Sequence, residues 1–131
     1  MHTIGIGVDI VQNQRIQKVL KNKNFMARIY SKKELSISKK RSNKVNFFAK
    51  RFAAKEAFVK ALGTGFRNNI NFKDIMVINN SYGKPKFIIN NKIRELLKKK
   101  FKSNKFKFYL SLSDEKSHSI AFVVIEKEYA K

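Results

Sequence analysis

The alternation of apolar and polar residues predicts strands at both ends of the chain. The apolar, glycine-interrupted run that begins at Ile4 is typical of a short buried strand over residues 3–10. Residues 105–113 alternate with a period of two, and residues 120–125 are almost entirely apolar. Because the polar segment 114–119 separates these two runs, they predict a C-terminal β-hairpin.

Between these strands the pattern is mainly helical. The clearest helix is predicted over residues 44–62, where Phe48, Phe52, Val59 and Leu62 recur on one side. Gly63 follows directly and is a common helix stop.

Weaker signals predict the remaining elements. Helices are expected over 12–21, 25–30 and 91–101, and a short helix is expected to follow a capping box of Ser31 and Glu34. The polar segment 36–46 is expected to be a loop or a frayed helix end. Strands are expected over 72–78 and 86–89, separated by a turn at 80–85. The lysine run Lys98–Lys100 is interpreted as a solvated helix end.

The order of these elements predicts an α+β fold with helices packed on an antiparallel sheet. The chain of 131 residues shows no repeat and no linker, so a single domain spanning 1–131 is expected.

The composition bounds the possible partners and the compartment. Thirty Lys and Arg against nine Asp and Glu give a net charge of +21, which attracts polyanions. Cysteine is absent, and no apolar stretch approaches the roughly 20 residues of a membrane span. The N-terminus reads as a strand rather than a signal peptide. We therefore expect a cytoplasmic protein with no membrane segment.

Glycine and proline occur at only three places: Gly5 and Gly7, Gly63 and Gly65, and Gly83 with Pro85. Such clustering marks backbone geometry that side chains would obstruct. The segment Gly63-Thr-Gly65 could approach a phosphate closely and offer backbone N–H groups.

Two carboxylates lie in unusual surroundings for so basic a chain. Asp9 ends the first apolar run, and Glu56 lies within the long helix beside Arg51, Lys55 and Lys60. Local explanations exist: Asp9 could cap the helix that follows, and Glu56 could form a surface ion pair with Lys60. Alternatively, the two carboxylates could form one divalent-metal and phosphate site, because a buried carboxylate needs a counter-charge.

Four segments together carry a resemblance to a known family. They are Gly5-Ile-Gly-Val-Asp-Ile10, the block from Arg51-Phe-Ala-Ala-Lys-Glu to Gly63-Thr-Gly65, the turn Gly83-Lys-Pro85, and Ser111-Leu-Ser113. In this order and spacing the chain resembles, over almost its whole length, the holo-[acyl-carrier-protein] synthases. These are short, single-domain 4′-phosphopantetheinyl transferases.

The resemblance implies a reaction, a fold and an assembly. The family transfers 4′-phosphopantetheine from coenzyme A to a serine of apo-acyl carrier protein and releases adenosine 3′,5′-bisphosphate, in support of fatty acid biosynthesis. The implied fold is the α+β phosphopantetheinyl transferase fold. Members commonly form homotrimers with active sites between subunits.

The resemblance also implies roles for particular residues. Asp9 and Glu56 match the ligands of Mg²⁺, and Lys60 matches a lysine that contacts the phosphates. Arg15 matches a basic residue that docks the acidic carrier protein. The coenzyme A cradle is matched by Arg51, Lys60, Gly63, Thr64, Gly65, Gly83, Lys84 and Pro85.

One position departs from the family. Many members have a histidine after the Ser-x-Ser strand, where this chain has Asp114. If that histidine contacts a phosphate of coenzyme A, Asp114 would have to act through water or another cation, or a lysine would have taken over the role.

Two other functions compete with the enzyme. The charge and the twelve phenylalanines would suit a basic nucleic-acid-binding module, and Asp114 would suit an inactive homologue that acts as an interaction protein. The motifs favour the enzyme, with no nucleic-acid partner.

Overall fold

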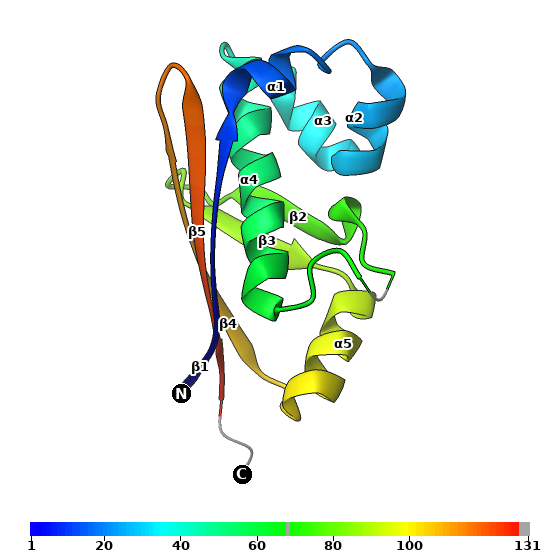
Figure 1. Ribbon diagram of the computed structural model, residues 1–131, viewed down its shortest axis with the longest axis vertical. Helices are drawn as coiled ribbons and strands as arrows, with labels where there is room; N and C mark the ends of the chain where they lie inside the picture. Colours follow the sequence, from blue (N-terminus) through cyan, green and yellow to red (C-terminus); the bar gives the residue numbers. More distant parts are fainter. Residues whose placement is uncertain (68, 129–131) are drawn as a thin grey trace.

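The core of the protein is a three-stranded antiparallel sheet backed by one long helix. The computed structural model describes residues 1–67 and 69–128. Its main sheet has the order β1-β5-β4, with β1 at His2–Gln12, β4 at Phe106–Asp114 and β5 at His118–Lys127 (Figure 1). The predicted C-terminal hairpin and the α+β class are confirmed.

The long helix α4 (Lys44–Leu62) has the predicted bounds and crosses the inner face of the sheet (Figure 1). Two glycines of β1 allow a close approach between strand and helix. A Cβ added at Gly5 would lie 1.8 Å from the Ala61 carbonyl oxygen, and one at Gly7 would lie 1.9 Å from that of Ala57. The backbones of β1 and α4 are therefore in direct contact.

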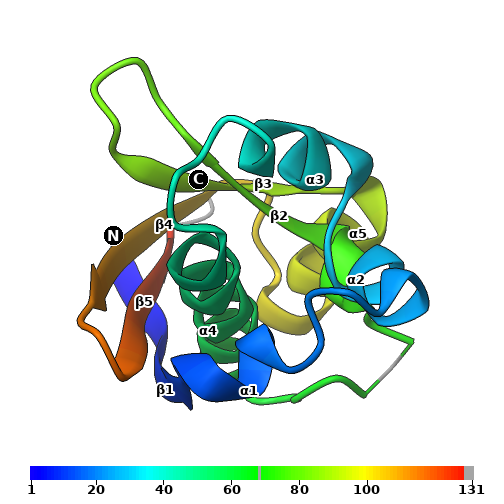
Figure 2. The ribbon, with the colours of Figure 1, turned by 90° about the horizontal axis from the view of Figure 1, so that it is seen from above.

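The apolar side predicted for α4 packs into the core, and burial extends well beyond that side. Buried residues lie on most of its sides and include the charged Arg51 and Lys55. The reason is that α4 lies at the centre of the molecule, with the sheet on one side and the other helices and a second hairpin around it (Figure 2). Glu56 is half-buried and Lys60 is exposed, on the side of α4 that remains open beside β1.

Three short helices follow β1: α1 (Asn13–Gln17), α2 (Lys23–Ile29) and α3 (Lys32–Ser38). The helix predicted over 12–21 begins one residue later, where β1 ends, and already stops at Gln17, because the N–H groups of Val19 and Leu20 bond three residues back and form turns. The side chain of Asn13, its first residue, is held by the β4–β5 turn. The Asn13 amide nitrogen donates to the carbonyl oxygens of Glu115 (2.9 Å) and Lys116 (3.2 Å).

The capping box of α3 is confirmed. The Ser31 hydroxyl accepts from the Glu34 N–H at 3.1 Å, and the Glu34 carboxylate accepts from the Ser31 N–H at 2.9 Å. In the segment 36–46, expected to be a loop or a frayed helix end, α3 ends at Ser38 and α4 begins at Lys44.

The second hairpin pairs β2 (Ile75–Asn79) with β3 (Pro85–Ile89) as a separate two-stranded sheet, and α5 (Asn91–Phe101) follows with its predicted bounds. The strand predicted over 72–78 begins later because Phe72–Asp74 forms the 3₁₀ helix η1. The Asp74 carboxylate closes the turn of η1, because it accepts from the Asn71 N–H at 2.8 Å and from the Asn90 side-chain amide at 2.7 Å.

A fully buried ion pair joins α3, α4 and β2. The Lys55 ammonium lies 2.8 Å from the Glu34 carboxylate and also donates to the carbonyls of Phe72 (3.1 Å) and Ile75 (2.7 Å). The other Glu34 oxygen accepts from the Val77 N–H at 3.1 Å. Both charged groups are therefore compensated, as buried charges must be.

None of the helices in the described part of the chain is both long and apolar enough to cross a membrane.

Candidate active site

Asp9, Glu56 and Lys60 meet at the edge of the sheet where β1 lies beside α4. The Lys60 ammonium donates to the Asp9 carboxylate at 2.8 Å and to the Val8 carbonyl at 3.1 Å. Asp9 therefore does not cap a helix, and the ion partner of Lys60 is on β1 rather than one turn away at Glu56. The structure replaces both local explanations with a cluster that spans two elements.

The Glu56 carboxyl shows the electrostatic character of this cluster. Burial, and then the nearby charge of Asp9, raise its pKa above the usual range, while Lys60 and Arg15 act in the opposite direction. The effect of Arg15 means that α1 brings its positive charge close to the same site. The site therefore holds two carboxylates and two cations in partly buried surroundings.

The carboxylate pair fits a magnesium ion. Mg²⁺ in proteins is often held by only one or two carboxylates, with phosphate oxygens and waters completing its shell. Asp9 and Glu56 supply two, and since burial and the Asp9 charge raise the pKa of Glu56, a cation bound by both would stabilise its charged form. Within the described ranges there is no cluster of three or more potential ligands that would form a complete protein cage.

The glycine-rich loop lies at the C-terminal end of α4, about 10 Å along the helix from Glu56 at 1.5 Å per residue. Gly63 and Gly65 have φ angles of 79° and 61°. The Gly63 N–H donates to Val59 (3.1 Å) and Lys60 (3.0 Å), and the Gly65 N–H donates to Val59 at 3.3 Å. These two N–H groups close the helix end, so both already have partners in this structure. The Thr64 hydroxyl donates to the Gly65 carbonyl at 2.8 Å.

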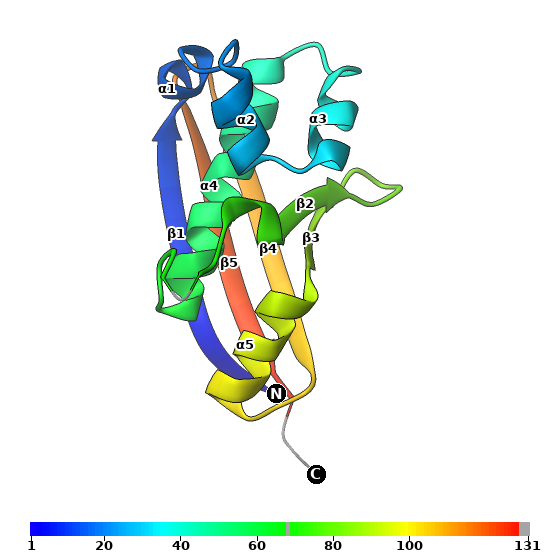
Figure 3. The same ribbon diagram turned by 90° about the vertical axis from the view of Figure 1, so that its right-hand side faces the viewer.

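The turn Gly83-Lys84-Pro85 lies elsewhere, at the tip of the β2–β3 hairpin. The Asn80 side chain builds this turn by accepting from the N–H groups of Tyr82 and Lys84, both at 2.9 Å. The tip projects on the side of the molecule opposite β1 and α1 (Figure 3).

Asp114 ends β4. Its carboxylate accepts from the Asn46 amide at 2.7 Å and lies 3.6 Å from the Lys50 ammonium. It therefore faces the first turns of α4 and a lysine, rather than the Asp9 cluster.

Arg51 supports the hairpin from inside. Only 2% of it is exposed, and its guanidinium stacks 3.6 Å from the centre of the Phe47 ring and donates to Asn79 at 3.3 Å. Burial lowers its pKa to about 10, and its Nε is buried with no hydrogen-bond partner among the described residues. Arg41 lies 5.6 Å from the same ring. The sequence did not single out Arg41, which falls in the predicted loop.

The predicted residues thus form two groups. Asp9, Glu56 and Lys60, with Arg15 nearby, lie at the β1 edge, and the Gly63–Gly65 loop ends the same helix. The Gly83–Pro85 turn, Arg51 and Asp114 belong to the β4 side. Strands β1 and β4 are separated by β5, which alone spaces them by about 10 Å.

Taken together, a carboxylate pair flanked by cations on a stable α+β scaffold is typical of an enzyme that transfers phosphate-containing groups. A family model described as the 4′-phosphopantetheinyl transferase superfamily matches residues 5–123. The chain belongs to this superfamily and, within it, to the holo-[acyl-carrier-protein] synthase family.

Named relatives and solved structures agree with this assignment. The holo-[acyl-carrier-protein] synthase of Pelagibacter ubique is 56% identical over 128 residues, covering 98% of this chain and 100% of the relative. The crystal structure of the Neisseria meningitidis synthase has a TM-score of 0.85 at 40% identity, covering 95% of this chain and 99% of that one. The crystal structure of the Bacillus anthracis synthase is described as a complex with CoA (3′,5′-ADP). It has a TM-score of 0.80 at 37% identity, covering 98% of this chain and 100% of that one.

Proposed function

We propose that the protein transfers 4′-phosphopantetheine from coenzyme A to a serine of apo-acyl carrier protein and releases adenosine 3′,5′-bisphosphate. The observation that carries this proposal is the meeting of Asp9, Glu56 and Lys60 at the β1 edge. The relatives named for this reaction match nearly the full chain. The product would serve fatty acid biosynthesis, and we place the protein in the cytoplasm as one domain.

The reaction needs charge neutralisation more than covalent help from the protein. The serine hydroxyl attacks the β-phosphorus of coenzyme A while the bond to the bridging oxygen of the α-phosphate breaks. That oxygen leaves with the electron pair as part of the bisphosphate, and the serine proton must pass to a base. A Mg²⁺ held by Asp9 and Glu56 would polarise the phosphate oxygens.

The other groups of this site would bind and orient the substrates. The Lys60 ammonium already faces the carboxylates at 2.8 Å, so it is placed to accompany the charge that develops on the leaving bisphosphate. Arg15 lies close enough to influence Glu56. Arg15 would contact the acidic carrier protein next to the reacting groups, and this charge attraction would make carrier-protein binding salt-dependent.

We further propose a homotrimer with active sites between subunits. The separation of the two groups of predicted residues supports it, because a single chain presents the carboxylate cluster and the Gly83–Pro85 turn on opposite sides. In an interface between copies, the carboxylate cluster of one copy would meet the turn and Asp114 of the next. Arg51 would act from beneath that turn.

The outer face of the sheet offers a surface for this assembly. Apolar residues of β1 stand beside those of β5 in register: Ile6 pairs with Val124, Val8 with Phe122, and Ile10 with Ile120. The exposed fractions of Ile6, Val8 and Ile10 exceed half. Contiguous apolar surface of this kind marks interaction sites.

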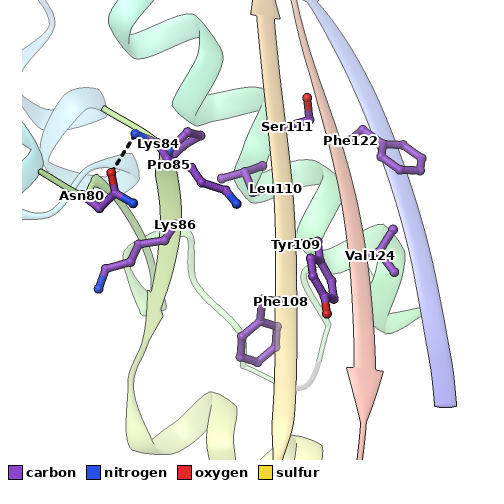
Figure 4. A pocket seen from close by; sticks show the side chains of 10 residues that line it. All are labelled: Asn80, Lys84, Pro85, Lys86, Phe108, Tyr109, Leu110, Ser111, Phe122 and Val124. Carbon is purple, nitrogen blue, oxygen red and sulfur yellow. Dashed lines mark hydrogen bonds between the residues drawn. The ribbon is translucent and has the colours of Figure 1, made fainter. Parts of the chain in front are cut away.

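A groove of about 390 Å³ continues this surface to the hairpin. Lys84 and Pro85 form one side of it, and Tyr109, Phe122 and Val124 lie on the other (Figure 4). A neighbouring copy that covers the sheet would therefore also approach the turn.

The transfer reaction is tested by incubating the protein with coenzyme A, Mg²⁺ and an apo-acyl carrier protein and then weighing the carrier by intact mass spectrometry. We expect a gain of one phosphopantetheine that requires Mg²⁺ and the carrier serine. Glu56→Gln and Asp9→Asn should abolish the gain in folded protein. A folded variant with full rate would refute the metal assignment.

The shared site is tested by mixing two inactive variants, Glu56→Gln and Lys84→Glu. Within mixed trimers, some interfaces would combine the intact halves, so activity should return on mixing. Light scattering should show three copies for the wild type and one for Phe122→Glu. A monomeric wild type with full activity would contradict this arrangement.

A further inference from the structure

Lys100 differs from the other lysines at the end of α5. Its ammonium donates to the Leu62 carbonyl of α4 at 2.5 Å. A Cβ added at Gly63 would lie 3.6 Å from the same nitrogen. The neighbouring Lys99 side chain makes no hydrogen bond or ion pair with any described residue. Lys98–Lys100 are all exposed, as expected of a solvated helix end, but Lys100 also bonds the end of α4.

Without the Lys100 ammonium, the C-terminal end of α4 would be an unfavourable position for a phosphate. The C-terminal end of a helix carries partial negative charge, and its last carbonyl groups lack helical partners. Phosphates usually bind at the opposite, N-terminal end. The Gly63–Gly65 loop nevertheless lies at the C-terminal end of α4, and its two glycine N–H groups are already bonded to Val59 and Lys60.

Positive charge at this loop must therefore come from side chains. Lys60 lies in the last turn of the helix and is engaged with Asp9. Lys100 stands at the carbonyl end itself and covers the Leu62 oxygen directly.

Helix α5 holds Lys100 in place. The Ile93 and Leu97 side chains of α5 are fully buried, which anchors the helix in the core. The ammonium thus ties a fixed helix to the last residue before the loop, and it keeps hydrogen atoms that can point toward a ligand.

We propose that Lys100 is a positioning residue for coenzyme A. It neutralises the C-terminal end of α4 and holds the Gly63-Thr64-Gly65 loop in the conformation that receives the phosphates. This inference rests on the proposed binding of coenzyme A at that loop.

The test compares four proteins: the wild type, Lys100→Met, Lys100→Arg and Lys99→Met. The last is a matched control, because it removes the same charge from the adjacent position of the same helix. We expect Lys100→Met to raise KM for coenzyme A about tenfold, the effect of losing one hydrogen bond from a charged donor. Its kcat should stay within about twofold, Lys100→Arg should recover most of the loss, and Lys99→Met should resemble the wild type.

Hydrogen exchange gives a second readout. In Lys100→Met the Gly65 amide should exchange faster while the amides of β5 keep their protection, because the change is confined to the loop.

Several outcomes would overturn the inference. One is a KM for Lys100→Met equal to that of the wild type or of Lys99→Met. Another is a fall in Tm and kcat with unchanged KM, which would show a purely structural role. If Lys100→Met does not fold, Lys100→Gln against Lys99→Gln makes the same comparison. A wild type that transfers nothing would speak against the proposed function, whereas an active wild type with an indifferent Lys100 would refute only this inference.

Discussion

Replacing Gly7 by alanine should separate the catalytic carboxylates by steric force alone. The new Cβ would lie 1.9 Å from the Ala57 carbonyl oxygen and 2.9 Å from the Ala61 nitrogen. Both are backbone atoms of α4, so no side chain can rotate to relieve the overlap. A carbon usually stays about 3.3 Å or more from a carbonyl oxygen, so β1 and α4 must move apart by roughly 1.4 Å.

This displacement acts directly on the site. Asp9 is two residues from Gly7 on β1, and Glu56 precedes Ala57 on α4. A misplacement of about 1 Å can reduce a rate roughly 100-fold. Overpacking of a core typically costs about 1–3 kcal/mol, which lowers Tm by roughly 4 °C per kcal/mol for a chain of this size.

The assay measures transfer by intact mass of the carrier protein and unfolding by circular dichroism. Gly5→Ala is the comparator, because its Cβ would lie 1.8 Å from the Ala61 oxygen but its position is farther from Asp9. We expect similar losses of stability and a larger loss of rate for Gly7→Ala. A folded Gly7→Ala protein with the Tm and rate of the wild type would refute the reasoning.

Three further perturbations have definite expected outcomes. Glu56→Gln should raise Tm at neutral pH in metal-free protein, and it should abolish transfer when Mg²⁺ is present. Burial and Asp9 raise the pKa of Glu56 in the folded protein, so the wild type loses stability as pH rises from the unfolded-state pKa to the folded-state pKa. A Tm difference between Glu56→Gln and the wild type that does not shrink on acidification to about pH 4 would contradict this. Lys55→Met should cost about 3–5 kcal/mol in urea unfolding because it leaves the Glu34 carboxylate buried without its partner, and adding Glu34→Gln should recover part of the loss; equal stability of single and double variants would argue against the pair. Arg15→Glu should lower kcat/KM for the carrier protein and weaken its salt dependence, and an unchanged salt dependence would remove Arg15 from docking.

Elements with strong local signals were predicted correctly from the sequence. Helix α4 combines a helical apolar pattern with Gly63, which takes the left-handed conformation at its end. The alternation in β4 and the following polar turn predicted the hairpin. These signals depend on residues within a few positions of one another, so they do not require knowledge of the rest of the fold.

Elements whose limits depend on distant partners were predicted less well. The helix expected over 12–21 ends at Gln17, where local turn bonds replace the helical ones, although its first residue, Asn13, is bonded to the β4–β5 turn more than 100 residues away in sequence. The strand expected over 72–78 starts late because Asp74 binds Asn90 and Lys92. For this strand a tertiary contact overrides the local pattern.

The sequence by itself determined the α+β class, the main helices and strands, and the family to which the chain belongs. It also supplied Asp9, Glu56 and Lys60 as candidates, through their unusual setting and the resemblance.

Only the tertiary structure decided which of these groups meet. Lys60 pairs with Asp9 rather than Glu56 because two glycines of β1 let the strand touch α4. The Gly83–Pro85 turn lies on the β4 side of the molecule, away from β1. Lys100 reaches the end of α4 from another helix, α5. Such pairings depend on how elements distant in sequence pack and on the reach of long side chains, neither of which is encoded in a local pattern of residues.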